Sequence, residues 1–532
     1  MDRDRLLGSG VGVAAIPVWL VCLMLFAIVP TTAQDDQTVP EVIDEDYHDT
    51  SIPVRDMAPV VPLGSSQHVV IPLRRRPGSP IVSPEPDAVI QDVRQGPLVG
   101  TTNKLNFDAI ADRDFVAPPD TNASVGNTQV VETVNTSYQV FNKATGASVF
   151  GPVEISSIWS GFGGVCGNSG NSFTDPVVLY DKAAGRWLIT ILASADGFAS
   201  GVECIAASTS ANATGAYHRY SFSFGTNNLN DYPKFGVWPD AYYGSYNMFS
   251  PTTFLGAKVC AYPRAAMLAG SPAKSVCFQR SVSDFGFLPS DLDGSIAPAA
   301  GEPNFFLELG TFTTLDLFKF HVNFATPSKS TFTGPTVLTV PSFTEACMGG
   351  VCIPQPGTTQ QLDSLGDRLM FRLAYRKFTT HEALAMTHSV KTGAAASGVR
   401  WYEIRNPNTA PTVFQKGTIT SGSTSLWMAS IGMDKVGDIA VGFSESSSSL
   451  HPAIAYTGRV PTDTLGTMES IDVVFKGAGS QTGGLTRWGD YTSMAIDPSD
   501  DCTFWYANEY IPSNGSFNWH TRLNSFKFTG CH

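Results

Sequence analysis

The chain has 532 residues, with 34 Lys and Arg against 47 Asp and Glu, and a formal net charge of −13. Apolar residues make up 42% of it, enough for a large core, so wholesale disorder is excluded. The acidic balance argues against nucleic acid as a partner, while 49 Gly, 35 Pro and 11% aromatic residues favour an all-β fold.

An uncharged apolar run from Val11 to Val29 lies near the N-terminus and is followed by the small residues Thr31 and Ala33. This pattern is typical of a secretory signal peptide over residues 1–33, cleaved after Ala33. The run is also long enough to span a bilayer as an uncleaved anchor, the one case in which we expect membrane attachment. The sequence therefore predicts a secreted protein, extracellular or periplasmic.

Residues 34–102 are rich in Pro, Asp and Val and show no sustained hydrophobic period. Such a composition is typical of a disordered or extended linker or stalk, and equally of a pro-segment that is removed. Within it, the run Arg74-Arg75-Arg76 is either a solvated group of charges or a processing site.

From residue 103 to residue 532, short β-branched and aromatic runs alternate with Gly, Asn, Asp and Pro, as in strands and turns. A hairpin-like unit recurs with turns near residues 127, 181, 240, 303, 367, 434 and 497, at a spacing of roughly 62 residues. Four-stranded units repeated around an axis form a β-propeller, so we predict seven four-stranded blades. A pair of β-sandwiches is the alternative. The last hairpin lacks an outer strand, and Lys104–Ile110 fits that place, so an N-terminal strand would close the ring in the C-terminal blade.

Eight cysteines follow the apolar N-terminal run, an even number that indicates disulfides in an exported chain. Cys502 and Cys531 fall at matching ends of an antiparallel strand pair, and Cys260 and Cys277 fall in neighbouring strands. Pairing the others in sequence order predicts four bridges: Cys166–Cys204, Cys260–Cys277, Cys347–Cys352 and Cys502–Cys531.

Several motifs resemble those of a group of uncharacterised exported, mostly bacterial proteins, over about Asp112 to Cys531. They are Asp175-Pro176, Tyr232-Pro233-Lys234, Arg400-Trp401-Tyr402-Glu403, Arg487-Trp488-Gly489-Asp490-Tyr491 and Cys502-Thr503-Phe504-Trp505-Tyr506. The resemblance implies no activity and transfers no functional residue. A looser likeness is to the sialidase superfamily, whose Asp-box hairpins read Ser-x-Asp-x-Gly-x-x-x-Trp. The turns at Asp181 and Asp434 lack the Ser and displace the Gly, so sialidase activity does not follow.

In a propeller the first strand of each blade lines a central channel, and the residues before it form one rim. Counting back from the turns places Trp427 and the following carboxylates there: Asp120, Asp175, Asp231, Asp293, Asp363 and Asp490. Such groups can cleave glycosides as an acid and a base or nucleophile, bind Ca²⁺, or cap turns through hydrogen bonds to the backbone. The predicted cation is Ca²⁺, centred on Asp120, Asp175, Asp231 and Asp490. Asp291-Leu292-Asp293-Gly294 has the start of a calcium loop without its remaining ligands.

Arginines and tryptophans each permit two interpretations. Arg372, Arg376, Arg400, Arg459 and Arg487 can clamp an acidic sugar or join blades by pairing with acids. Trp159, Trp401, Trp427 and Trp488 can stack on sugar rings or fill the core. The catalytic candidates are Asp120, Asp175, Asp231, Asp490, Arg400, Glu403 and Arg487.

Two functions follow, and the fold alone does not choose between them. The first is an exported propeller that binds glycans or cell-surface and extracellular partners, since the sequence has no clear catalytic constellation. The alternative is a carbohydrate-active enzyme, a sialidase-like glycoside hydrolase or a polysaccharide lyase, that uses the acidic rim of the central channel.

Overall fold

The computed structural model describes residues 39–60, 68–393 and 395–532, so the predicted signal peptide lies outside the described residues. Strands dominate this part of the chain, as the all-β prediction requires. Helical structure in it is limited to α1 (Arg264–Leu268) and short 3₁₀ segments at Val54–Asp56, Val93–Gln95, Ile155–Trp159, Pro327–Lys329 and Ala346–Gly349. Within these residues we find no helix of the length and apolarity needed to cross a membrane.

Most of the strands form seven groups of four, each an antiparallel meander. The first three groups are β7 (Asn122–Val125), β8 (Gln129–Thr133), β9 (Ser137–Asn142) and β10 (Ser148–Glu154); β11 (Ser172–Asp181), β12 (Arg186–Ser194), β13 (Val202–Ser208) and β14 (Tyr217–Ser223); and β15 (Leu229–Val237), β16 (Ala241–Ser250), β17 (Thr253–Pro263) and β18 (Lys274–Gln279).

The next three groups follow in chain order, with the short pair β23 (Val351–Ile353) and β24 (Leu362–Asp363) between the first and second of them. They are β19 (Leu288–Asp293), β20 (Asn304–Leu309), β21 (Thr314–His321) and β22 (Thr331–Thr339); β25 (Met370–Lys377), β26 (Glu382–Val390), β27 (Gly398–Arg405) and β28 (Thr412–Thr420); and β29 (Ser425–Met433), β30 (Ile439–Ser446), β31 (Ala453–Arg459) and β32 (Asp472–Lys476).

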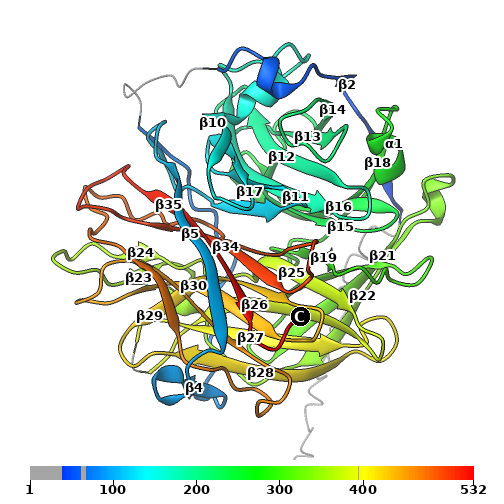
Figure 1. The fold of residues 1–532 in the computed structure, drawn as a ribbon. Helices are drawn as coiled ribbons and strands as arrows, with labels where there is room; N and C mark the ends of the chain where they lie inside the picture. Colours follow the sequence, from blue (N-terminus) through cyan, green and yellow to red (C-terminus); the bar gives the residue numbers. More distant parts are fainter. Residues whose placement is uncertain (1–38, 61–67, 394) are drawn as a thin grey trace, which may run out of the picture. The chain divides into compact units, whose positions relative to one another are not determined.

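The seventh group combines strands from distant parts of the sequence. Its members are β33 (Ser493–Ile496), β34 (Thr503–Tyr510), β35 (His520–Phe528) and β5 (Thr101–Ala111). β5 pairs antiparallel with β35, with Asn106 opposite Asn524, and Figure 1 shows the blue strand beside the red one. Residues 104–110, which the sequence assigns to an outer strand, lie within β5.

The first strand of each group, which we call the inner strand, contacts the inner strand of the next group. The contacts run from β7 through β11, β15, β19, β25 and β29 to β33, and β33 in turn contacts β7. Between β19 and β25 the contact includes parallel strand pairing, which joins their two groups into one sheet. Most residues of the inner strands are buried, including polar ones such as Asn230, Lys234 and Ser290.

The described part of residues 34–102 is extended and lies along the groups. β1 (Glu41–Asp44) pairs with β18, β2 (Tyr47–Thr50) with β14, and β4 (Ile90–Asp92) with β28, each an outer strand. β3 (Val69–Val70) pairs with β6 (Val116–Ala117). These pairings cover strand edges that would otherwise offer free backbone groups to other chains.

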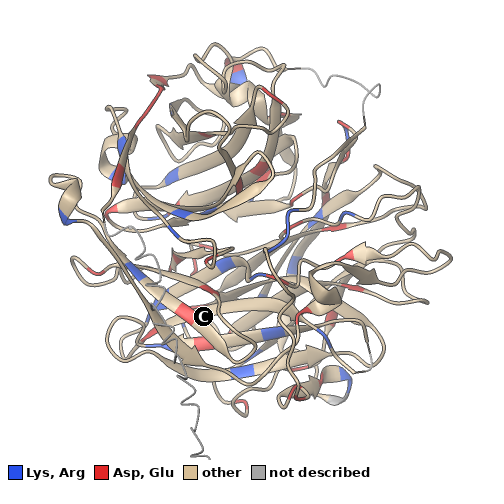
Figure 2. Cartoon of the chain, turned by 180° about the vertical axis from the view of Figure 1, so that it is seen from behind, with Lys and Arg blue, Asp and Glu red and all other residues tan. Residues whose placement is uncertain are grey.

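All four predicted disulfides are present: Cys166–Cys204, Cys260–Cys277, Cys347–Cys352 and Cys502–Cys531. Four bridges in one chain indicate folding in an oxidising compartment. Charged side chains are sparse, and in Figure 2 acidic and basic residues are interspersed along the ribbon.

The tryptophans proposed as sugar-stacking residues lie in the core. Trp159, Trp401, Trp427 and Trp488 are fully buried, so the alternative that they stack on a ligand is wrong. The rings of Trp427 and Trp488 lie 5.6 Å apart, and the Trp488 indole N–H donates to the Ser444 hydroxyl at 3.1 Å. Burial of a ring this large, with its polar N–H satisfied, stabilises the interior of a β-protein.

Candidate functional site

The inner strands have two sides, which we call the start side and the turn side after the ends at which these strands begin and finish. On the start side the structure brings together the four carboxylates to which the sequence assigned calcium. With them lie four cationic side chains, and together they form what we call the core charge cluster: Asp120, Asp175, Asp231, Asp490, Arg74, Lys234, Arg368 and Arg487.

The backbone at this side is irregular in a repeated way. Asp120, Asp175 and Tyr232 adopt positive φ angles of 50°, 58° and 57°, in the left-handed region that is uncommon for residues other than glycine. The pairing register shifts at the same places in β11 and β15. A β-bulge interrupts the alternation of side-chain directions along a strand. These bulges therefore explain how carboxylates of separate strands point to one place.

Hydrogen bonds join Asp120, Asp175 and Asp490, through the Asp120 carboxylate, the Asn135 amide and the backbone N–H groups of Asp175 and Asp490. The Asn135 amide donates to Asp120 Oδ2 at 2.9 Å, and its oxygen accepts the Asp175 N–H at 2.8 Å. The N–H of Asp490 donates to Asp120 Oδ1 at 2.7 Å. These bonds have the form of the turn-capping alternative considered for the rim carboxylates.

Cations of the chain itself lie among the carboxylates. Arg487 forms ion pairs at 2.6 Å with both Asp363 and Asp490, and Arg74 pairs with Asp231 at 3.0 Å. Lys234, in β15, is fully buried, and its Nζ lies 3.4 Å and 4.0 Å from the ring centroids of Tyr232 and Tyr491. A calcium ion at this place would compete with these cations, and the calcium site stays a prediction.

Burial shifts the pKa values of the cluster. It raises the pKa of Asp120 well above its usual value, and the neighbouring charges of Asp490 and Asp175 act in the same direction. Burial raises the pKa of Asp231 to about 7 and that of Asp363 to about 6, against the opposing effect of arginines. It lowers the pKa of Lys234 to about 8, although Asp175 and other carboxylates oppose the shift. Asp231 and Lys234 of the cluster, and Asp363 beside it, therefore exchange protons near neutral pH.

Residues 71–76 of the N-terminal segment lie against this cluster. Arg487 Nε donates to the Ile71 carbonyl at 2.9 Å, the Arg368 guanidinium donates to the Arg74 carbonyl, and the Arg76 N–H donates to Asp367 at 2.7 Å. Asp120 is fully buried and Asp490 is 7% exposed. Chemistry on a substrate at the acidic rim would therefore require this segment to move.

Asp293 and Asp291 do not belong to this side, contrary to the rim assignment of Asp293. Asp293 is the last residue of β19, so it lies at the far end of the inner strand and not before its start. Arg372 binds Asp291 at 2.9 Å and Asp293 at 2.8 Å. The assignment is wrong because residue 303 is the end of a long loop between β19 and β20, so counting back from it does not reach the start of the inner strand.

Two other catalytic candidates, Arg400 and Glu403, lie on β27 and outside the cluster. Arg400 pairs with Asp87 at 2.7 Å, so it ties the N-terminal segment to its group. Glu403 accepts hydrogen bonds from Arg405 and Gln415. The structure thus brings together five of the seven catalytic candidates and leaves these two elsewhere.

On the turn side lies a pocket of about 780 Å³, which we call the turn-side pocket. It is formed by the turns that follow β25, β29 and β33 and by the ends of β27, β28 and β31, and Glu403 lines it. The Phe378 ring stacks on His381 at 4.7 Å, and the Arg405 guanidinium lies 3.3 Å from the Phe414 ring centroid. Ring faces beside hydrogen-bonding groups suit a sugar ligand.

Sequence reasoning missed several residues of both places. Lys234 could have been found from the sequence, because a lysine within a strand that is expected to be buried needs buried partners. Phe378, Phe414 and Lys435 carried none, since the pocket assembles them from separate turns and strands.

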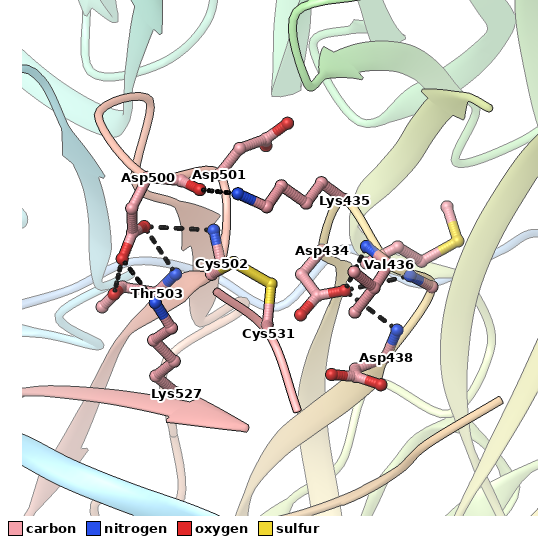
Figure 3. The surroundings of a disulfide bond; sticks show 12 residues. Asp434, Lys435, Val436, Asp438, Asp500, Asp501, Cys502, Thr503, Lys527 and Cys531 are labelled. Atoms are coloured by element: carbon pink, nitrogen blue, oxygen red, sulfur yellow. Dashed lines mark hydrogen bonds and ion pairs between the residues drawn. A yellow bond between two sulfur atoms is a disulfide. The ribbon is translucent and has the colours of Figure 1, made fainter. Parts of the chain in front are cut away.

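A potential group of metal ligands lies beside the turn side. Among the described residues, Asp434, Cys502 and Cys531 place ligand atoms within 4.8 Å of one another. The two sulfurs are bonded to each other, as Figure 3 shows, so they are not thiolate ligands. The group is the packing of a carboxyl against a disulfide.

The chain matches no family model and no curated protein. Among solved structures it is similar to the GH93 alpha-L-arabinofuranosidase of Fusarium graminearum in complex with arabinobiose, at 8% identity and a TM-score of 0.38, over 80% of this chain and 98% of that one. It is similar to the alpha-L-arabinanase of Penicillium chrysogenum at 9% identity and 0.37, over 68% and 100%, and to Drosophila Plexin A at 7% and 0.35, over 82% and 89%. Similarity at this level defines no activity, so function is inferred from the geometry.

Proposed function

We propose that the chain is an exported seven-bladed β-propeller that binds a glycan in the turn-side pocket. Seven antiparallel groups of four strands support the blade count. Contacts between successive inner strands, including β33 with β7, support a closed ring, and the pairing of β5 with β35 would seal it within the last blade.

The observation that carries the binding function is the pocket itself. Its volume of about 780 Å³ falls within the range of small-molecule sites and would hold several sugar units. Phe378 and Phe414 are only half-buried, so their rings have free surface. The acidic rim, by contrast, is closed by the N-terminal segment and neutralised by arginines.

A glycan array tests this function, with the wild type beside Phe378→Ala/Phe414→Ala. We expect retention of at least one glycan class by the wild type, and its loss in the double variant. Phe312→Ala is the matched control, because this phenylalanine is exposed in the turn between β20 and β21. Retention that is equal in all three proteins would refute the pocket as the site.

Catalysis at the acidic rim is the second candidate, favoured by the gathering of Asp120, Asp175, Asp231 and Asp490. Grouped carboxylates with separated proton affinities can serve as acid and base in glycoside cleavage. The run at Arg74 to Arg76 would then be the processing site that releases the covering segment. Incubation with a trypsin-like protease, followed by assay for reducing sugar and unsaturated uronate, tests this. Cleavage in the run without any release of sugar would count against it.

A further inference from the structure

The turn-side pocket differs in charge from the rest of the chain. Its lining contains five cations, namely Arg376, Lys377, Arg405, Lys435 and Arg459, against three carboxylates, Glu403, Asp500 and Asp501. The whole chain has the opposite balance, 34 basic against 47 acidic residues. We propose that the glycan is acidic and that Arg459 and Lys435 bind its carboxylate or sulfate. This inference rests on the proposed function.

Three of the five cations already have carboxylate partners. Arg376 forms two hydrogen bonds with Asp501, at 2.9 Å and 2.7 Å. Arg405 pairs with Glu403, and Lys377 pairs with Glu382 at 2.8 Å. These pairs shape the wall of the pocket and leave little net charge to attract a ligand.

Arg459, at the end of β31, is different. It is 2% exposed and donates to two backbone carbonyls, that of Thr467 at 3.2 Å and that of Asp463 at 2.9 Å. Across the described residues no carboxylate lies within ion-pair distance of it. Asp463, Glu403 and Asp438 act on its charge from farther away, but burial outweighs them and lowers the pKa of the Arg459 guanidinium. An incoming anion therefore has more to gain here than at an ion-paired arginine.

The other four arginines that the sequence grouped with Arg459 provide the comparison. Arg372, Arg376, Arg400 and Arg487 each form ion pairs with aspartates, which is the structural alternative considered for all five. Arg459 alone among these five keeps the features required of a clamp for an acidic sugar, a charged fork at the lining of a pocket.

Lys435 is exposed in the turn after β29, and its position is fixed from two sides. Asp434 Oδ1 accepts the N–H groups of Val436 at 3.0 Å and Asp438 at 2.9 Å, which holds the turn. Lys435 Nζ donates to the Asp500 carbonyl at 3.1 Å, across to the neighbouring loop (Figure 3).

The carboxylates of that loop are already engaged and do not neutralise Lys435. Figure 3 shows the Asp500 carboxylate with its partners. It accepts the N–H groups of Cys502 at 3.0 Å and Thr503 at 2.9 Å, and it lies 3.4 Å from Lys527 Nζ. Asp501 is bound by Arg376. The Lys435 charge is therefore available to a ligand.

Calorimetric titration with matched probes tests the proposal. The probes are an oligogalacturonate, the same oligosaccharide after its carboxyl groups are reduced, and a sulfated neutral galactan. We expect the oligogalacturonate or the sulfated galactan to bind at least tenfold more tightly than the reduced form. The stronger of the two identifies the anionic group. Affinity should also fall as salt is raised, since the attraction is partly exposed.

Lys435→Gln should weaken binding of the anionic probe about three- to tenfold, and Lys435→Arg should retain it. Lys329→Gln is the matched control, an exposed lysine in the 3₁₀ segment Pro327–Lys329, and should leave binding unchanged. Arg459→Lys, which keeps the charge without the fork, should weaken binding more than Lys435→Gln does. Equal affinity for the charged and reduced oligosaccharides would overturn this inference and leave glycan binding in place. Binding of none of the three probes would overturn it as well, and binding of neutral glycans on the array would then show that the proposed function survives.

Discussion

The two sides of the inner strands carry similar charged residues but differ in how far ion pairs neutralise them. On the start side, Asp120, Asp175 and Asp490 are buried beside Lys234 and Arg487, and each charge is met by another group of the chain. On the turn side, Arg459 and Lys435 donate hydrogen bonds to backbone carbonyls and form no ion pair among the described residues, although Asp463, Glu403 and Asp438 lie near Arg459. Grouped charges therefore indicate a ligand site where the chain provides them with no ion-pair partner, and a structural role where ion pairs within the chain neutralise them.

The covering of each side reinforces this contrast. Residues 71–76 lie against the start side: they accept hydrogen bonds from Arg368 and Arg487, and the Arg76 N–H donates to Asp367. The turns on the other side are held apart by their own hydrogen bonds, as in the turn that Asp434 caps, and leave a pocket between them.

Loss of Arg487 should have the largest effect on the free energy of unfolding. Arg487→Met leaves Asp363 and Asp490 buried without their common partner, which costs about 3–5 kcal/mol. Lys435→Met on the turn side should change stability by less than about 0.5 kcal/mol. Urea unfolding of both variants measures the difference. A smaller loss in Arg487→Met than in Lys435→Met would contradict the assignment of the two sides.

Removal of the Cys502–Cys531 disulfide should come next. The bridge closes a loop with a sequence separation of 29, worth roughly 3–4 kcal/mol in the chain-entropy model. Cys502 also adjoins Asp501 of the pocket wall, so Cys502→Ala/Cys531→Ala should weaken glycan binding too. Removal of Cys260–Cys277, which joins β17 and β18, is the control and should lower stability with binding intact. Equal binding losses in both would remove the link to the pocket.

The start side also predicts how stability depends on pH. The Asp231 pKa is about 7 in the folded protein and about 3.9 in an unfolded chain, so between these values the native state holds a proton that the unfolded state lacks. Stability should therefore fall as pH rises from 5 to 7, by up to about 1.4 kcal/mol per pH unit for each such group. The lowered pKa of Lys234, about 8, has its effect only above this range.

Urea unfolding at pH 5, 6 and 7 measures this slope, and Asp231→Asn should flatten it. Asp500→Asn is the control, because hydrogen bonds from Thr503 and Cys502 hold the pKa of Asp500 well below its usual value, so its proton exchange lies below this range. A wild-type slope of the opposite sign would refute the protonated cluster.

The sequence predicted features that lie within one strand group or between paired strands. It failed for contacts between residues that are far apart in the sequence. Apolar inner strands, the outer strand at Lys104–Ile110 and the four disulfides follow from local patterns and strand pairing. The gathering of Asp120, Asp175 and Asp490 also followed, because the repeat puts equivalent positions on one side.

Ion-pair partners that lie on distant elements could not be predicted from local sequence patterns. Arg74 and Arg487 bind carboxylates in distant groups, and no local pattern links Arg74 to Asp231. Asp293 was misplaced because a long loop between β19 and β20 shifted the repeat. Positions set by loops of irregular length escape a periodic argument.

On the turn side, single aromatic changes should affect binding far more than stability. Phe414→Ala removes one ring face and its contact with Arg405, so glycan affinity should fall up to about tenfold. Affinity electrophoresis in the retained glycan measures it, and Phe312→Ala should migrate like the wild type. An unchanged mobility of Phe414→Ala would exclude the ring from the site.

Calcium should have the smallest effect. Lys234, Arg74 and Arg487 already lie among the carboxylates of the cluster, so thermal melts in EDTA and in millimolar Ca²⁺ should differ by no more than about 1 °C. A clearly higher Tm in Ca²⁺ that Asp175→Asn abolishes would support the calcium site predicted from the sequence and contradict a self-neutralised cluster.

A crystal structure of the protein with the glycan retained on the array would show which side of the inner strands binds the sugar. We expect the sugar on the turn side, against Phe378 and Phe414 and within reach of Lys435, with residues 71–76 still bonded to Arg487. A sugar bound among Asp120, Asp175 and Asp490, with that segment displaced, would contradict it.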